Sequence, residues 1–296
     1  MPRPLPIALL ALALLGGCAS SPPRTTAAMN SATPAPRASV AANDNLDAVV
    51  WTQTAIEHDL IYLQTYRDAQ SRLLAALHDP NWDALARGDR MAPSQGLKPA
   101  VVLDIDETVL DNSPYQARLV RRGGEYSEAD WAAWCREEAA RALPGAVAFT
   151  QFAASHGIAV IYISNRASEL DRVTLANLRK AGLPVSGPQA FLGLGTAVDG
   201  CRQVGTSKAC RRQLISRNYR VLMQFGDQVG DFVDVASPTI AGRNQAMAAY
   251  LDWIGRRWFV LPNTTYGSWE SAVFDNRWSL PAAERRQMKF QALKYN

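Results

Sequence analysis

Short apolar runs alternate with longer amphipathic stretches along the chain from residue 100 onward. Runs of about four to eight apolar residues predict buried strands, and apolar positions that recur every third or fourth residue predict helices. The strands predicted in this way are residues 100–105, 158–163, 189–194, 219–225 and 257–261. The helices predicted between them are residues 127–142, 146–155, 169–181 and 207–217. Buried strands that alternate with helices indicate an α/β fold with a parallel sheet of about five strands.

A long amphipathic pattern precedes the region of alternating strands and helices. Residues 45–78 contain neither Pro nor Gly, and apolar residues recur there with helical spacing. This pattern predicts one long N-terminal helix. A small helical cap segment is expected at residues 125–142, where Ser127 is a favourable N-cap.

The first 43 residues differ from the rest in composition. Arg3 precedes the apolar run 7–15, and small residues follow it, which is the order of a secretory signal peptide over residues 1–17. The run is too short for a transmembrane helix, which needs ~20 apolar residues. Residues 18–43 are rich in Ala, Ser, Thr and Pro and predict a disordered tether. We expect one folded domain over residues 44–296.

The sequence LGGC at residues 15–18 resembles a bacterial lipobox. This resemblance implies cleavage before Cys18 and a lipid on its thiol, so that the mature chain is anchored to a membrane. Ala19 and Ser20 follow Cys18, and in Gram-negative lipoproteins that pattern implies sorting to the outer membrane, on its periplasmic or its cell-surface side. The alternative is an ordinary signal peptide with an incidental cysteine.

Composition and charge limit the number of domains and the kinds of partner that can be expected. Of 296 residues, 48% are hydrophobic and 20% are charged, which supports one or two domains with real cores. The net charge of +4 is small and no basic block occurs, so a nucleic-acid polymer is not expected as a partner. The oligomeric state is open. Cys201 and Cys210 are close enough in sequence to form a disulfide, and Cys135 would then be a free thiol. The alternative is that all three cysteines are free thiols.

Acidic residues crowd the end of the first predicted strand, in VVLDIDETVLDNSPY at residues 101–115. Asp104 and Asp106 alternate, so in an extended segment both carboxylates can point to the same face. SNR at residues 164–166 and GDQVGD at residues 226–231 follow two further strands, at the edge of a parallel sheet where ligands bind. Hard oxygen ligands of this kind suit Mg²⁺. A carboxylate there can also attack phosphorus, while a second one moves the proton.

These motifs occur in the order typical of the haloacid dehalogenase superfamily. DIDET has the form DxDxT, and SNR, a Lys and GDQVGD follow it. With AVVWTQTAIEHDLIYLQTY, DNSPY and LPNTTYGSWE, the chain resembles the bacterial class C acid phosphatases over residues 45–270. The resemblance implies a Rossmann-like, haloacid dehalogenase-like sheet and Mg²⁺-dependent hydrolysis of phosphate monoesters. It points to nucleoside 5'-monophosphates as substrates, with nicotinamide mononucleotide among them.

The resemblance also implies a role for each matched residue. Asp104 matches the nucleophile, which also ligates Mg²⁺, and Asp106 matches the general acid/base, which ligates the metal through its backbone carbonyl. Lys208 matches the Lys that neutralises the phosphoryl group, although Arg202, Arg211 and Arg212 lie close to it in sequence. The other matches are Thr108 in the first motif, Ser164 and Asn165 for phosphate, Asp227 as the third protein ligand, and Asp231 through a metal-bound water. Gly230 stands where the family often has a further acid.

Other conspicuous residues have plainer interpretations. Asp111 fits a turn, Glu107 has no assigned role, and Ser164 could instead be an N-cap for the helix near residue 169. Tyr115 and Tyr266 are expected in loops, where each could stack on a nucleobase. Core or structural positions are expected for Trp131, Trp134, His58, His78 and His156. Two other functions remain open: a phosphotransferase with the same site, and a non-catalytic lipoprotein that binds a ligand or an adhesion partner.

Overall fold

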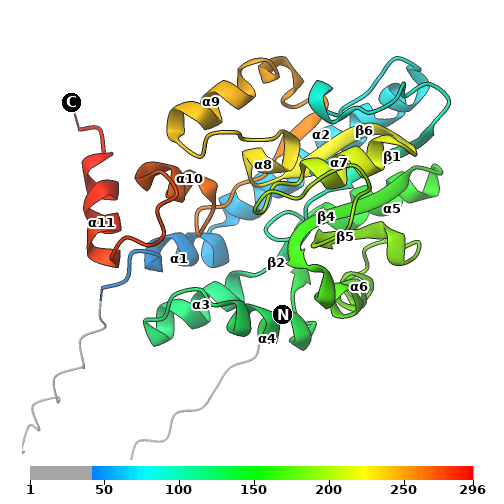
Figure 1. Cartoon of the computed structure of the whole chain (residues 1–296). Helices are drawn as coiled ribbons and strands as arrows, with labels where there is room; N and C mark the ends of the chain where they lie inside the picture. The colour runs from blue at the N-terminus through cyan, green and yellow to red at the C-terminus, as the bar shows by residue number, and fades with distance from the viewer. Residues whose placement is uncertain (1–41, 296) are drawn as a thin grey trace, which may run out of the picture. The chain divides into compact units, whose positions relative to one another are not determined.

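The computed structural model describes residues 42–295 of the chain, so the predicted signal peptide, Cys18 and almost all of the predicted tether lie outside the described residues. Its centre is a five-stranded parallel sheet in the order β5-β4-β1-β6-β7 (Figure 1). The strands are β1 (Lys98–Leu103), β4 (Ala159–Ala167), β5 (Phe191–Leu194), β6 (Tyr219–Gly226) and β7 (Trp258–Val260). The predicted α/β fold with about five parallel strands is confirmed.

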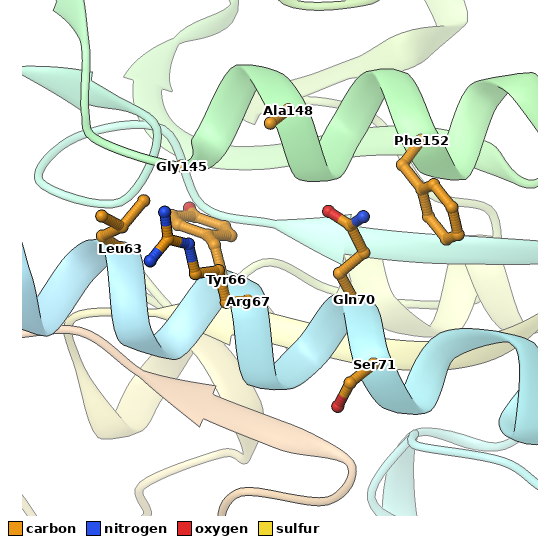
Figure 2. Close-up of a pocket in the computed structure, with 8 residues that line it drawn as sticks. All are labelled: Leu63, Tyr66, Arg67, Gln70, Ser71, Gly145, Ala148 and Phe152. Atoms are coloured by element: carbon orange, nitrogen blue, oxygen red, sulfur yellow. The ribbon is translucent and has the colours of Figure 1, made fainter.

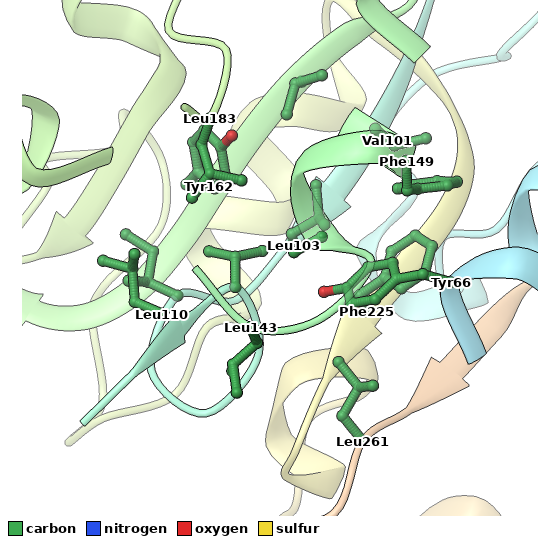
Figure 3. Packing of buried hydrophobic residues seen from close by; sticks show 14 of the residues in the cluster. Tyr66, Val101, Leu103, Leu110, Leu143, Phe149, Tyr162, Leu183, Phe225 and Leu261 are labelled. Atoms are coloured by element: carbon green, nitrogen blue, oxygen red, sulfur yellow. The ribbon is translucent and has the colours of Figure 1, made fainter. Parts of the chain in front are cut away.

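Side chains of the central strand alternate between two hydrophobic clusters. Val101 and Leu103 pack in the larger cluster with aromatic side chains that include Phe225 (Figure 3). This cluster lies under α2 (Ile56–His78) and α5 (Ala146–Ser155). Val102 belongs to the other cluster, on the side of α7 (Ala209–Ser216). The sheet is thus buried on both faces, which leaves its strand ends as the place for polar chemistry.

The prediction of one helix over residues 45–78 is wrong. The segment forms α1 (Leu46–Thr54) and α2, separated by Ala55 in an extended conformation with φ −79° and ψ 119°. α1 packs against α3 (Ser113–Arg122), where Gln53 Nε2 donates to Ser113 Oγ at 3.2 Å. α2 packs against α5 and β6 instead. Because neither Pro nor Gly marks the break, the tertiary contacts determine where the helix ends.

The helix predicted over residues 127–142 is shorter than expected. Ser127 is its N-cap, as predicted, and accepts a hydrogen bond from Asp130 N at 3.2 Å. The helix, α4 (Glu128–Glu137), ends at Glu138, which has a φ of +50°. Beyond it, β3 (Arg141–Ala142) pairs antiparallel with β2 (Leu110–Asp111). This pairing overrides the helical propensity of the sequence between them.

Further elements surround this core. α5 has its predicted bounds, and α6 (Asp171–Lys180) follows a 3₁₀ turn at Ser168–Leu170. Helices that the sequence pattern did not predict are α3, α8 (Val229–Phe232), α9 (Ile240–Ala248), α10 (Ser268–Ser271) and α11 (Ala282–Gln291). Short 3₁₀ helices occur at Arg87–Asp89, Pro188–Ala190, Leu251–Trp253 and Ala272–Phe274. Among residues 42–295, no helix combines the length and the apolar character needed to cross a membrane.

Cys201 and Cys210 form a disulfide, with their Cα atoms 5.6 Å apart, and Cys135 is a buried free thiol. The alternative of three free thiols is therefore wrong. The disulfide joins Cys201, in the segment between β5 and α7, to Cys210 in the first turn of α7, and Lys208 lies inside the loop that it closes. It thus constrains the backbone of a residue predicted to serve the site.

Candidate active site

The predicted site residues meet at the carboxyl ends of three adjacent strands. Asp104 directly follows β1, and its N–H donates to the Phe225 carbonyl of β6 at 3.0 Å. Asp227 directly follows β6 itself. On the other side of β1, β4 runs on through Ser164 and Arg166, further than predicted. The strand order β4-β1-β6 therefore brings three motifs that are far apart in sequence to one edge of the sheet (Figure 1).

Three carboxylates form one cluster at this edge. Oxygens of Asp104, Asp227 and Asp231 all lie within 4.8 Å of one another. Lys208 Nζ donates to Asp104 Oδ1 at 2.5 Å and to Asp231 Oδ1 at 2.6 Å. The three carboxylates and the one ammonium group leave a net charge of −2 when all are ionised. A buried surplus of negative charge is costly unless a cation compensates it.

The pKa values in the cluster follow from this imbalance. Burial, opposed by Lys208 and reinforced by Asp231, raises the pKa of Asp104 to about 7. Desolvation, with Asp231 and Asp104 nearby, raises the pKa of Asp227 well above its ordinary value. Burial works against the charge of Lys208, yet its two carboxylate partners raise its pKa overall. The acids are thus less ready to ionise together than isolated carboxylates are.

The donor set fits a divalent cation. Asp227 Oδ2 accepts hydrogen bonds only from neutral amides, from Gln228 Nε2 at 2.9 Å and from Asn263 Nδ2 at 2.8 Å. No positively charged group among the described residues is paired with this carboxylate. Carboxylate oxygens are the ligands that hard divalent ions prefer, and a charge of +2 would balance the cluster. Asp104, Asp227 and Asp231 are the residues that could hold the ion.

Asp106 lies apart from the three-acid cluster. Its carboxylate is held by Arg166, whose Nη2 donates to Oδ1 at 2.8 Å, and by Asn112, whose Nδ2 donates to Oδ1 at 2.9 Å. Ser164 Oγ donates to Oδ2 at 3.2 Å. The two acids of DIDET therefore have different partners, although the sequence pattern suggested one shared face.

The second motif is fixed by an arginine of α7. Arg211 donates to the Ser164 carbonyl at 2.5 Å through Nη1 and to Asn165 Oδ1 at 2.7 Å through Nη2. Ser164 is buried within β4, and α6 begins only at Asp171, so the N-cap interpretation of Ser164 is wrong. Asn165 is exposed at this edge. Thr108 is fully buried, with its Oγ1 3.5 Å from Asp104 Oδ2.

Comparisons with known proteins agree with this geometry. The sequence profile of the HAD (haloacid dehalogenase) superfamily, subfamily IIIB (acid phosphatase), matches residues 26–269, which is most of the chain. The chain belongs to this acid phosphatase family.

Solved structures identify the class of acid phosphatase within this family. Two structures of the class C acid phosphatase from Bacillus anthracis, one with tungstate bound, superpose with TM-scores of 0.74 and 0.73. Each is 33% identical in sequence, and the match covers 85% of this chain and 97% of that chain. Their likeness places this chain among the class C acid phosphatases.

Plant relatives are more distant. A stem 28 kDa glycoprotein and a stem 31 kDa glycoprotein of Glycine max are each 29% identical over 142 residues. These matches cover 46% of this chain, and 53% and 46% of the two glycoproteins. The chain thus spans about half the length of these relatives.

In this acid phosphatase fold, the two candidate stacking tyrosines differ. Tyr115 is only 2% exposed and lies in α3, not in a loop, with its ring against Trp131 at 5.1 Å. Its expected loop position is therefore wrong, because Pro114 lies in the first turn of a helix and does not end a turn. Tyr266 does lie in a loop and is partly buried, and its hydroxyl donates to Glu107.

Glu107, which had no assigned role, links two parts of the site. Its backbone is left-handed, with a φ of +53°, and its buried carboxylate accepts from Asn112 N at 2.8 Å and from the Tyr266 hydroxyl. Burial, reinforced by Asp106, raises its pKa well above the ordinary value. The residue joins the loop after β1 to the loop of Tyr266.

The remaining predictions concern aromatic and histidine residues. Trp134 is buried, as expected, and its Nε1 donates to Asn112 Oδ1 at 2.8 Å. Trp131 is only partly buried and lies over Arg166, with 5.5 Å between the ring centroid and Cζ. His58 is buried, whereas His78 and His156 are exposed. Asp111 lies in strand β2, not in a turn, because it pairs with Arg141; its carboxylate accepts from Ser113 N at 2.8 Å.

Arg166, Asn112 and Asn263 contact the key acids but were not assigned from the sequence. Each stands inside a motif that carries the resemblance: SNR, DNSPY and LPNTTYGSWE. The motifs themselves were the available signal, although they do not say which acid each residue contacts.

A groove of about 430 Å³ lies elsewhere, between α2 and α5 (Figure 2). Tyr66, Arg67 and Phe152 are among its lining residues. None of the clustered carboxylates lines it. The groove therefore belongs to helix packing and not to the candidate site.

Proposed function

We propose that this chain is a Mg²⁺-dependent phosphatase that hydrolyses phosphate monoesters through an aspartyl phosphate on Asp104. The observation that carries the proposal is the contrast between two acids at one strand end. Asp104 lies against Lys208 within a cluster suited to a cation, and Asp106 stands apart with hydrogen-bonding partners of its own. A nucleophile needs nearby positive charge for the phosphoryl group, and an acid needs freedom from the metal.

The reaction balances with these two residues. An Asp104 oxygen forms a bond to phosphorus while the bond from phosphorus to the ester oxygen breaks, and that oxygen takes a proton from Asp106. A water oxygen then attacks phosphorus and gives a proton back to Asp106. The bond from phosphorus to Asp104 breaks, which releases phosphate and restores the carboxylate. Lys208 and the Ser164–Asn165 segment would bind the phosphoryl oxygens.

A cation held by Asp104, Asp227 and Asp231 would supply positive charge that offsets the negative charge of the nucleophile and the phosphoryl group. We assign Mg²⁺ because the donor set consists of carboxylate oxygens alone. The tungstate bound to the Bacillus anthracis relative supports an oxyanion site, because tungstate is tetrahedral like phosphate.

Nucleoside 5'-monophosphates, including nicotinamide mononucleotide, are the substrates that we propose. Tyr266 supports this choice, since it is the partly buried aromatic ring in the loop that also supplies Asn263 to Asp227. An aromatic face next to a phosphate site suits a base at the other end of a nucleotide. Tyr115, buried in α3, has no part in this proposal.

Phosphate release from AMP and p-nitrophenyl phosphate, with Mg²⁺ and with a chelator, tests the function. The wild type should release phosphate only with the cation. Asp104→Asn should lose at least ~10³-fold in kcat, because the amide cannot form the acyl phosphate. Equal rates in the two proteins would contradict the nucleophile, provided that both melt at similar temperatures.

We also propose that the chain is a lipoprotein of the outer membrane, anchored through Cys18. The lipobox-like LGGC and the following Ala19 support this. A Cys18→Ala variant should leave the membrane fraction after cell lysis, whereas the wild type should sediment with outer-membrane vesicles. A variant that remains in that fraction would show that another feature holds the protein there.

A further inference from the structure

The two oxygens of the Asp106 carboxyl group have different surroundings. Oδ1 accepts three hydrogen bonds: from Arg166 Nε at 3.0 Å, from Arg166 Nη2 at 2.8 Å, and from Asn112 Nδ2 at 2.9 Å. Oδ2 has two longer contacts, with Arg166 Nε and Ser164 Oγ, both at 3.2 Å. Donors thus saturate Oδ1 but not Oδ2.

Packing fixes the guanidinium that makes these contacts. The Arg166 side chain is 0% exposed, whereas the Asp106 side chain is 14% exposed. The Trp131 ring covers the guanidinium, and Asn112 is itself held by the Trp134 indole. A planar fork that is buried in this way allows a carboxylate few orientations. Asp106 is therefore held from its buried side and reaches solvent on the other.

A proton on this carboxyl group can reside on one oxygen only. The groups around Oδ1 are N–H donors, and neither the guanidinium nor an amide nitrogen accepts a hydrogen bond. Arg166 Nε also lies 3.2 Å from Oδ2, but the other group there, the Ser164 hydroxyl, can rotate and act as donor or acceptor. Oδ2 is thus the oxygen that can carry an acidic proton, and the contacts at Oδ1 determine where Oδ2 points.

We propose that Arg166, supported by Asn112, is a positioning residue that orients Asp106 Oδ2 for proton transfer to the leaving alcohol. The inference rests on the proposed phosphatase function and adds to it the groups that aim the acid. As phosphorus binds Asp104 and separates from the ester oxygen, that oxygen takes the proton from Oδ2. General acid catalysis of this kind contributes about 10²–10⁴-fold, and only at hydrogen-bond distance.

The leaving group provides the test, because a good leaving group needs little protonation. Without a proton, the ribose 5'-oxygen of AMP is a poor leaving group, phenolate is a better one, and p-nitrophenolate is the best of the three. For Arg166→Gln we expect kcat/KM to fall ~100-fold or more with AMP, less with phenyl phosphate, and under ~10-fold with p-nitrophenyl phosphate. The ratio kcat/KM is the proper readout, since it covers the steps up to departure of the alcohol.

Two further variants keep the test decisive. Arg166→Lys retains the buried charge but not the fork, so it should fold and show the same selective loss at a smaller size. In an Asp106→Asn background, Arg166→Gln should add no further selective loss, because the residue would act only through Asp106. A loss that persists there would overturn the proposal.

A matched control is Arg90→Gln. Arg90 also makes a two-pronged pair with an aspartate, Asp83, at 2.7 and 2.8 Å. Arg90 also donates to the Tyr219 carbonyl at the start of β6, whereas Asp106 follows the carboxyl end of β1. Its loss should lower the melting temperature without changing the ratio between substrates. Equal losses with all three substrates in the Arg166 variants, or no loss, would overturn the positioning role. A wild type inactive on all three would instead contradict the proposed function.

Discussion

Asp104 and Asp106 are two residues apart at the end of one strand, yet their surroundings differ in kind. Asp104 meets a lysine and two further carboxylates, whereas Asp106 meets an arginine, an asparagine and a serine. The group around Asp104 carries a surplus of negative charge. Around Asp106, by contrast, one carboxylate is paired with one guanidinium. Partners from other strands and loops thus give identical side chains, two positions apart, different surroundings, which match the separate tasks of the mechanism that we propose.

The type of cation on each side fits its task. Lys208 is a compact point charge on a flexible stem, which can follow a phosphoryl group or yield to it. Arg166 is a planar fork that fixes the direction of the acid it binds. We call these the lysine side and the arginine side of the site. Changes to the lysine side should affect every substrate equally, and changes to the arginine side should depend on the leaving group.

Among the predictions that compare the two sides, the largest loss of activity is expected for Lys208→Met. Removing one group that stabilises developing charge costs about 10²–10³-fold in kcat, and the loss should be the same for AMP and p-nitrophenyl phosphate. Steady-state kinetics with both substrates measures it. Lys180→Met is the control, because Lys180 is exposed and donates only to the Glu138 carbonyl. A loss with AMP alone would mean that Lys208 assists protonation of the leaving group, as Asp106 does, and would contradict the distinction between the two sides.

Metal removal should make stability depend on pH through the lysine side. The pKa of Asp104 is about 7 in the native chain and near 3.8 in the unfolded one, so the native state binds more protons between these values. The contribution of Asp104 to the free energy of unfolding is therefore fully present below about pH 4. It is lost as the pH rises to about 7, which lowers the free energy of unfolding by on the order of 4 kcal/mol. Urea unfolding in a chelator at several pH values measures it, and added Mg²⁺ should flatten the profile. A chelated protein that gains stability over this range would contradict the charge surplus.

The disulfide should support the lysine side alone. Replacing Cys201 and Cys210 by Ser opens a loop with a sequence separation of 9, which costs about 3 kcal/mol in the chain-entropy model. Lys208 lies in that loop, so we expect kcat to fall about tenfold with AMP and with p-nitrophenyl phosphate alike. Kinetics below the melting temperature measures this. A fall that depends on the leaving group would mean that the loop also affects Asp106.

Much of the fold could be predicted because buried strands and capped helices have local signals. The break at Ala55 and the pairing of Arg141–Ala142 with β2 could not, since each depends on a contact with a remote segment. Tyr115 was misplaced for a related reason: Asn112, Ser113 and Pro114 fit a turn, yet here they open α3.

The site divides in the same way. The acids of the lysine side stand in spaced motifs, so Asp104, Asp227 and Asp231 could be expected to meet at one sheet edge. The arginine side depends on a pairing across 60 residues, from Arg166 to Asp106, which no spacing in the sequence indicates. Motif order therefore predicts which residues gather, and only the structure shows which partner each one takes.

The smallest effect is expected at Cys135, a free thiol near the arginine side. Burial, only partly opposed by Arg166, raises its pKa to about 12 from a usual 9.0. Because the thiolate is the reactive form, its fraction at pH 8 falls from about 10% to about 0.01%, so alkylation should be ~1000-fold slower than for an exposed thiol. Iodoacetamide followed by mass spectrometry should find Cys135 unmodified in the native protein and modified in urea, with activity unchanged. Rapid labelling in the native protein would mean that the helix over Arg166 opens, and the arginine side would then be too mobile to aim Asp106.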